Sequence, residues 1–211
     1  MADLTFYYGP MGCSKTANAL MARHNALSMN QKVWLIKPSV DTRDDKILKD
    51  GNRISMVRSR VGIEAEAQPI YKNDHICPPP YTSIIICDEA QFLQSWQVDE
   101  LNEIAKDFDI PVLCYGLRTD FMTRAFTGSQ RLFEIADRLI ELETFCECGK
   151  KAVLTAKFHD GKLVLSGNQI DIGGDEKYKA MCYRCWRNFK LNMECEDEQE
   201  LDYLYYSFNY L

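Results

Sequence analysis

The stretch FYYGPMGCSKT, residues 6–16, decides the fold of this chain. Its spacing Gly-x-x-x-x-Ser-Lys-Thr is close to a phosphate-binding loop, in which glycine lets backbone N–H groups curl around phosphates, lysine reaches their oxygens and a hydroxyl binds magnesium. The apolar run LTFYY precedes it and a helical pattern follows it, as anion binding at a helix N-terminus requires. The alternative is an ordinary strand-to-helix turn, and the context favours the phosphate loop. Its predicted residues are Gly9, Pro10, Met11, Gly12, Cys13, Ser14, Lys15 and Thr16.

Apolar runs and helical periodicity alternate over the first two-thirds of the chain, which is typical of a parallel sheet covered by helices. These patterns predict strands over residues 4–8, 33–36, 83–87 and 111–117, helices over 15–27 and 98–108, and a helix with a short strand within 129–142. Helical spacing predicts two buried faces. They consist of Leu20, Met21, His24 and Leu27, and of Val98, Leu101, Ile104, Ala105 and Phe108. We therefore expect an α/β fold, a P-loop NTPase-type parallel sheet flanked by helices, over residues 1–143.

A second motif, IIICDEAQF at residues 84–92, ends an apolar strand with two carboxylates. Ligands of α/β proteins bind beyond the carboxyl ends of the strands. Asp88 suits a magnesium shell, and Glu89 is then free to act as a base or to position a water molecule. The alternative is a strand that simply ends in two solvated carboxylates. The phosphate loop upstream favours the functional interpretation.

The segment from Asp41 to Ala67 is polar and weakly periodic. Loops of this length in compact domains are usually functional or disordered. We expect a mobile segment near the ligand.

The nine cysteines include two close pairs, Cys146/Cys148 and Cys182/Cys185. Four thiolates form tetrahedral structural zinc sites, and Gly149 permits the turn that the tight first pair needs. Free reduced thiols are the alternative. A hairpin with Asp160-Gly161 at its turn is expected between the pairs. We predict a small zinc-binding lasso domain over residues 144–190, clamped at its root by the metal, and an acidic, tyrosine-rich tail over 191–211.

Composition excludes some classes of protein. A net charge of -6 argues against binding to duplex nucleic acid, which usually needs a basic face. No run approaches the roughly 18 apolar residues of a membrane span. The N-terminus MADLTFYYGP has no targeting pattern, so we expect a soluble, cytoplasmic protein.

Four motifs in this order, FYYGPMGCSKT, DEAQF, PVLCYGLRTDF and IGGDEKYKAMCYRC, resemble the type II thymidine kinase family, from about residue 4 to about residue 190. The resemblance implies transfer of the γ-phosphoryl group of ATP to the 5′-hydroxyl of thymidine, with Mg²⁺, bound at Thr16 and Asp88, and Glu89 as base. It also implies a homotetramer and feedback inhibition by dTTP. Ser14 stands where the family has glycine. We expect that difference to bear on ATP affinity and turnover, because Lys15, Thr16, Asp88 and Glu89 are all present.

The resemblance also assigns residues beyond the loop. Asp41 and Arg43 are expected near the phosphates, with a solvated surface pair as the alternative, and Gln91 joins the phosphate-side set. The expected thymidine residues are Met11, Phe92, Leu117, Phe121, Phe126, Gln169, Ile170, Asp171, Ile172, Gly173 and Tyr178. For any single phenylalanine an ordinary core position is the alternative. Two other functions stay open: a nucleotide-binding regulator without phosphoryl transfer, and a P-loop ATPase with another substrate.

Overall fold

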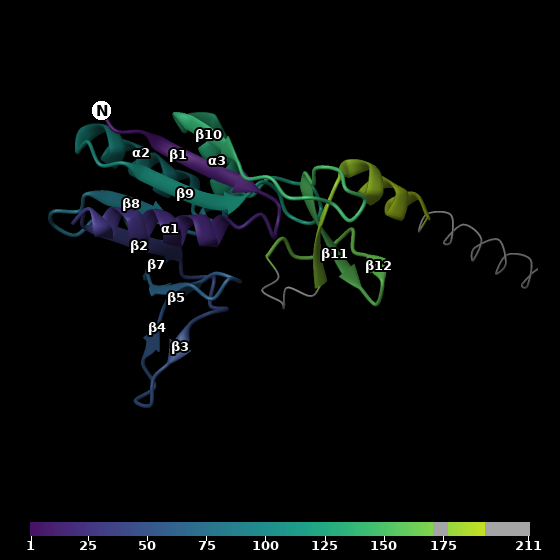
Figure 1. Cartoon of the computed structure of the whole chain (residues 1–211), viewed down its shortest axis with the longest axis horizontal. Coiled ribbons are helices and arrows are strands. Elements are labelled where there is room, and N and C mark those ends of the chain that lie inside the picture. Colours follow the sequence, from purple (N-terminus) through teal and green to yellow (C-terminus); the bar gives the residue numbers. More distant parts are fainter. Residues whose placement is uncertain (171–176, 193–211) are drawn as a thin grey trace, which may run out of the picture.

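The computed structural model describes residues 1–170 and 177–192. Its main body is a six-stranded sheet with the strand order β10-β1-β9-β8-β2-β7, and every neighbouring pair is parallel (Figure 1). The strands are β1 (Leu4–Gly9), β2 (Val33–Pro38), β7 (Gln68–Ile70), β8 (Ile84–Cys87), β9 (Val112–Leu117) and β10 (Arg138–Glu141). The predicted α/β fold with a parallel sheet is confirmed.

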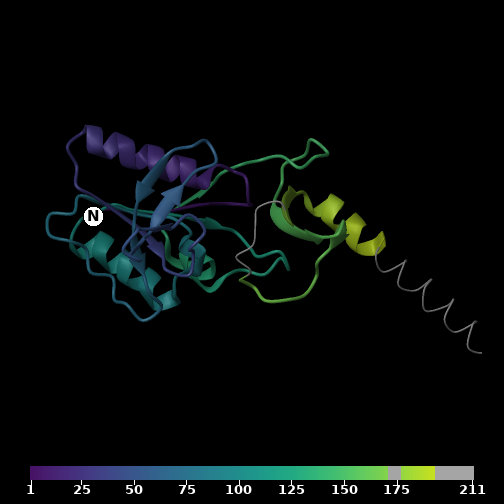
Figure 2. The same ribbon diagram turned by 90° about the horizontal axis from the view of Figure 1, so that it is seen from below.

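Helices cover both faces of this sheet. One face is covered by α1 (Lys15–Ser28), and the other by α2 (Ser95–Asp107) and α3 (Thr127–Ile135), as the view in Figure 2 shows. A short 3-10 helix, η1 (Ala90–Phe92), follows β8. Ile85, Ile86 and Cys87 of β8 are buried because both faces of the sheet are covered, which explains why the run at residues 84–87 lacks polar alternation.

The buried faces of the two long helices differ from expectation at four positions. The expected α1 face is wrong except for Leu20, because Met21, His24 and Leu27 are exposed. Small Ala19 packs against the sheet instead, which lets the helix approach closely. On α2, Val98, Leu101, Ile104 and Ala105 are buried as expected. Phe108 lies just beyond the last helical residue and is exposed, since the helix ends at Asp107.

The polar segment 41–67 contains regular structure that its sequence did not indicate. It forms two antiparallel ladders, β3 (Lys46–Ile47) with β4 (Arg53–Ile54), and β5 (Met56–Arg58) with β6 (Glu64–Glu66). These ladders were not predicted, and the mobility expected of the segment stays a prediction. Strands of two or three residues are too short to show alternation, which explains the miss.

A second, smaller sheet follows the main body. Its order is β12-β11-β13, built from β11 (Leu154–His159), β12 (Lys162–Leu163) and β13 (Tyr178–Met181). Asp160 and Gly161 both have positive φ, 47° and 79°, at the turn between β11 and β12, so the predicted hairpin is confirmed. Residues 183–192 are helical. None of the helices described here has the length and apolar character of a membrane span.

Candidate active site

The segments that carry the predicted site residues meet at the carboxyl edge of the large sheet. Gly9 ends β1 in register with Leu117, which ends β9, and Cys87 ends β8 in register with Cys114 of β9 and Ile36 of β2. A cleft of about 710 Å³ opens beside these strand ends. The predicted residues that line it are Met11, Gly12, Ser14, Lys15, Thr16, Asp41, Arg43, Asp88, Glu89, Gln91, Phe92, Leu117, Phe121, Phe126, Gln169, Ile170 and Tyr178.

Three predicted residues of the described part of the chain, Gly9, Pro10 and Cys13, belong to the phosphate loop but do not line the cleft. A Cβ atom on Gly9 would lie 2.5 Å from the Leu142 carbonyl oxygen, so glycine is required there by close packing. Asp171, Ile172 and Gly173 lie outside the described residues.

The phosphate loop carries a buried cation. The Lys15 ammonium donates to the carbonyl oxygen of Pro10 at 2.7 Å and to that of Gly9 at 3.4 Å. It can exchange these partners for phosphate oxygens, which are stronger acceptors because they are charged. The loop leads directly into α1, whose first N–H groups add a partial positive charge.

Ser14 occupies a conformation that favours glycine. Its φ and ψ are 62° and 26°, in the left-handed region, and its side chain makes no capping hydrogen bond to α1. A non-glycine residue there costs about 1–2 kcal/mol. The serine therefore holds a strained backbone conformation at the start of α1.

Asp88 is one of the buried carboxylates of the cleft. Burial and the neighbouring charge of Glu89 raise the pKa of Asp88 to about 7, while a hydrogen bond from the Thr16 hydroxyl opposes the increase. A carboxylate and a hydroxyl in contact, next to a phosphate loop, are oxygen ligands of the kind that Mg²⁺ uses together with substrate phosphates. The residues present therefore fit a magnesium ion.

Glu89 is held from two sides. Its Oε1 atom forms an ion pair with Nη2 of Arg43, and its Oε2 atom accepts a hydrogen bond from the Gln91 amide. The Oε1 atom of Gln91 in turn accepts from the backbone N–H of Leu117 at 3.0 Å. These contacts fix the carboxylate in the cleft and connect it to the end of β9.

Asp41 and Arg43 form a partly buried pair, so the solvated-pair alternative is wrong. Arg43 donates its Nε–H to Asp41 Oδ1 at 2.7 Å. Burial opposes ionisation of Asp41, but the hydrogen bond from Arg43 and the charges of Arg43 and Lys37 lower its pKa overall. The charge of Glu89 is the largest influence that raises the pKa of Arg43, so the guanidinium stays charged.

Aromatic side chains form the other half of the cleft. The rings of Phe92 and Phe126 meet edge to face with centroids 5.4 Å apart, and Phe121 is buried beside them. Tyr178 of β13 reaches the same cleft from the small sheet. An apolar wall with polar groups at its rim is typical of a site for a flat heterocyclic ring.

Several cleft residues were missed by sequence reasoning. Arg58, Ser59 and Arg60 come from β5 and the turn after it, and Thr155 comes from β11. The Thr155 hydroxyl accepts a hydrogen bond from the backbone N–H of Met11 at 2.9 Å, which ties the phosphate loop to the small sheet. Two arginines in the polar segment are a signal that could have indicated an anion site.

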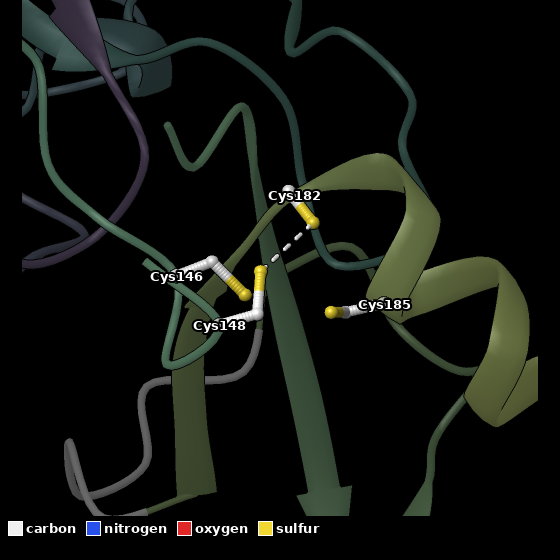
Figure 3. A group of neighbouring side chains, drawn as sticks. All are labelled: Cys146, Cys148, Cys182 and Cys185. Atoms are coloured by element: carbon white, nitrogen blue, oxygen red, sulfur yellow. Dashed lines mark hydrogen bonds between the residues drawn. The ribbon is translucent and has the colours of Figure 1, made fainter. Parts of the chain in front are cut away.

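The four predicted zinc ligands converge at the base of the small sheet. The Sγ atoms of Cys146, Cys148, Cys182 and Cys185 all lie within 4.8 Å of one another and point toward a common centre (Figure 3). Gly149 has φ 79° in the turn after the first pair. A Zn–S distance of about 2.3 Å in a tetrahedron places sulfurs roughly 3.8 Å apart, so the cluster fits zinc.

The pKa values of Cys146 and Cys185 are shifted by the groups around them in the cluster. Burial opposes ionisation of Cys146, but backbone N–H groups of Cys148 and Cys182 lower its pKa to about 7. Neighbouring thiols raise the pKa of Cys185. Several thiolates in one cluster repel one another unless a metal ion offsets their charge.

Comparison with known proteins gives consistent matches. The family profile described as "Thymidine kinase" matches residues 2–186. The thymidine kinase of Enterobacteria phage T4 is 41% identical over 194 residues, covering 88% of this chain and 96% of the relative. That of Shewanella oneidensis is 37% identical over 197 residues, covering 90% and 98%. That of Encephalitozoon cuniculi is 40% identical over 197 residues, covering 87% and 86%.

Proposed function

Because this chain belongs to the thymidine kinase family, we propose that it transfers the γ-phosphoryl group of ATP to the 5′-hydroxyl of thymidine, giving dTMP and ADP. The observation that carries the proposal is that a phosphate loop, the acidic pair Asp88 and Glu89, and an aromatic wall line one cleft. A nucleoside against that wall directs its sugar toward the acidic pair, and a triphosphate on the loop meets it from the other side.

The phosphate side of the cleft binds ATP in this proposal. Backbone N–H groups of residues 9–16 and the Lys15 ammonium contact the phosphates. Asp41, Arg43 and Gln91 complete this side, with the Arg43 guanidinium offsetting charge on the transferred group. Thr16 and Asp88 hold the magnesium ion, which when bound neutralises charge on the phosphate oxygens.

Glu89 acts as the general base. Its carboxylate accepts the proton of the thymidine 5′-hydroxyl as the new O–P bond forms and the bond between the γ-phosphorus and the bridging oxygen breaks. Its αL backbone conformation, φ 51°, and its contacts with Arg43 and Gln91 support this role because they hold the carboxylate in one place.

Thymidine is bound by the aromatic side of the cleft. The faces of Phe92, Phe121 and Phe126 offer stacking and methyl contacts, with Met11, Leu117 and Tyr178 at the edges. The stretch from Gln169 to Gly173 supplies backbone hydrogen bonds to the base edge in this proposal.

Zinc in the four-cysteine cluster has a structural role. Four protein ligands leave no open position for substrate, so the ion clamps the root of the lasso over residues 149–181. We assign residues 1–143 to the nucleotide-binding domain and 144–190 to the lasso domain. A homotetramer, dTTP as feedback inhibitor and a cytoplasmic location are further proposals, and they rest on family resemblance alone.

A product assay tests the proposed function. Purified protein is incubated with Mg²⁺, ATP labelled at the γ-phosphate and thymidine, and labelled dTMP is quantified. Thymidine-dependent formation of dTMP supports the kinase. Tight thymidine binding without dTMP supports the nucleotide-binding regulator, for which the strained Ser14 is the motivating observation. ATP hydrolysis that is indifferent to thymidine supports a P-loop ATPase with another substrate.

A further inference from the structure

Lys37 is a fully buried lysine in the middle of the protein. It lies in β2, and its side chain is 0% exposed. A buried ammonium is costly unless it is paired and hydrogen-bonded. A buried lysine in the otherwise apolar strand β2 therefore has to be explained by what surrounds it.

Three acceptors surround this ammonium, two from the loop after β2 and one from β5. Its Nζ atom lies 2.9 Å from Asp45 Oδ1, 2.7 Å from the carbonyl oxygen of Met56 and 3.6 Å from Asp41 Oδ2. The contacts with Asp45 and Met56 are hydrogen bonds, and the contact with Asp41 is an ion pair. Both carboxylates are almost fully buried.

One of the two carboxylates leads directly into the catalytic cleft. Asp41 turns Oδ2 toward Lys37 and Oδ1 toward Arg43 Nε, at 2.7 Å. Arg43 then pairs with Glu89. The result is a line of alternating charges, cation, anion, cation, anion, that runs from the buried strand to the proposed base.

The other carboxylate leads away from the cleft. Asp45 Oδ1 accepts hydrogen bonds from the Met56 N–H at 3.2 Å and the Ser55 hydroxyl at 3.3 Å. It therefore anchors β5 to the loop after β2, with no contact to Glu89 among the interactions of the described residues. Lys37 thus has one partner on the catalytic side and one on the structural side.

We propose that Lys37 is a positioning residue for phosphoryl transfer, an inference that rests on the proposed function. Its buried ammonium orients Asp41, and Asp41 in turn holds Arg43 against Glu89. Without that cation, the buried Asp41 carboxylate is left with the Arg43 guanidinium to offset its charge. Arg43 is then drawn toward Asp41 and away from Glu89, which leaves the base misplaced.

A double-substitution cycle at positions 37 and 43 tests this inference. Lys37→Met keeps the length of the side chain and removes its charge. We expect it to lower kcat by about 10-fold or more, with the KM for thymidine within about 3-fold, because small misplacements at a reacting centre are costly. In the Arg43→Ala background the same substitution should lower kcat by less than about 2-fold, because Lys37 acts through Arg43.

Asp45→Asn is the matched control. This substitution removes the charge of Asp45, the second carboxylate beside the Lys37 ammonium, and keeps an acceptor oxygen. We expect the melting temperature to fall because a buried ion pair is lost. The kcat should stay within about 2-fold of the wild-type value because Asp45 does not contact Arg43 or Glu89 among the described interactions. If Lys37→Met does not fold, the double variant Lys37→Met/Asp45→Asn is used, because it removes one buried charge of each sign. Its kcat is compared with that of Asp45→Asn alone.

The outcomes separate this inference from the proposed function. Wild-type dTMP formation tests the function, whereas the coupling between positions 37 and 43 tests the inference. If the wild type forms no dTMP, the same cycle is measured on the dissociation constant of ATP, which Arg43 is proposed to contact. Effects of Lys37→Met that are equal in both backgrounds would overturn the inference and leave Lys37 a structural cation.

Discussion

Arg43 and Glu89 form an ion pair across the cleft, although they are far apart in the sequence. Arg43 belongs to the loop after β2, and Glu89 follows β8, the neighbouring strand of the sheet. The side chains are 34% and 15% exposed, so the pair is partly shielded from water. This ion pair links Arg43, which is proposed to offset phosphate charge, to Glu89, which is proposed to accept the proton of the sugar hydroxyl.

Removal of the Arg43 guanidinium should damage catalysis more than stability. We expect Arg43→Ala to lower kcat for dTMP formation by about 10²-fold, since charge stabilisation and the position of Glu89 are both lost. Arg131→Ala is the matched control, because Arg131 is also 34% exposed and pairs with two carboxylates, but does not line the cleft. Equal loss of kcat in both variants would contradict the assignment.

Ser14→Gly should relieve strain without loss of function. Glycine adopts the left-handed conformation freely but gains freedom in the unfolded chain, so the free energy of unfolding rises by no more than about 1 kcal/mol. The KM for ATP should stay equal or fall. Asn30→Gly is the control, with φ 59° at the end of α1. A large rise in the KM for ATP in Ser14→Gly would show that the hydroxyl itself contacts phosphate.

The affinity for Mg²⁺ should depend on pH near neutrality. Below about pH 7 Asp88 is protonated in the folded protein, and magnesium must displace that proton. Binding of Mg²⁺ with ATP should therefore weaken as the pH falls from 8 to 6, with proton release in calorimetry. Asp88→Asn should bind weakly at every pH. Affinity of the wild type that does not change over this range would refute the magnesium role of Asp88.

The raised pKa of Asp88 also makes the stability of the protein depend on pH. Because the pKa of Asp88 is raised on folding, the folded protein binds more protons than the unfolded chain between about pH 4 and pH 7. This carboxyl therefore lowers the free energy of unfolding as the pH rises through that window. Asp88→Asn should remove this part of the pH dependence in metal-free buffer, as thermal unfolding can measure.

The cysteine cluster should bind one zinc ion per chain. Cys185→Ser should lose the metal and lower the melting temperature by roughly 5 °C or more, since a structural metal contributes directly to folding. Cys77→Ser is the control, because Cys77 is exposed and lies outside the cluster. Elemental analysis and thermal unfolding measure both effects. A wild type without zinc, or equal behaviour of the two variants, would contradict the prediction.

The sequence was most informative where a local pattern determines the structure. Apolar runs locate the central strands, the loop of residues 9–16 follows from its spacing, and the cysteine pairs predict the cluster. The exposed Met21 and Leu27 show where such patterns fail, since α1 packs through Leu20 and the small Ala19 and Ala26. Local pattern does not report how closely a helix approaches the sheet.

Contacts between distant loops could not be predicted. The pairing of Arg43 with Glu89 depends on the path of two loops, and the ladders β3 to β6 are too short to appear as patterns. Buried Lys37 contradicts the usual preference of lysine for the surface. Its partners become evident only once Asp41, Asp45 and Met56 are seen around it.

The role of Glu89 as the base is tested most directly by the rate of dTMP formation by Glu89→Gln, measured beside Glu100→Gln on α2. Glu100 pairs with His75 and does not line the cleft. We expect Glu89→Gln to lower kcat by about 10²–10⁴-fold while ATP still binds, and Glu100→Gln to keep wild-type turnover. Wild-type turnover by Glu89→Gln would contradict its role as the base that accepts the thymidine proton.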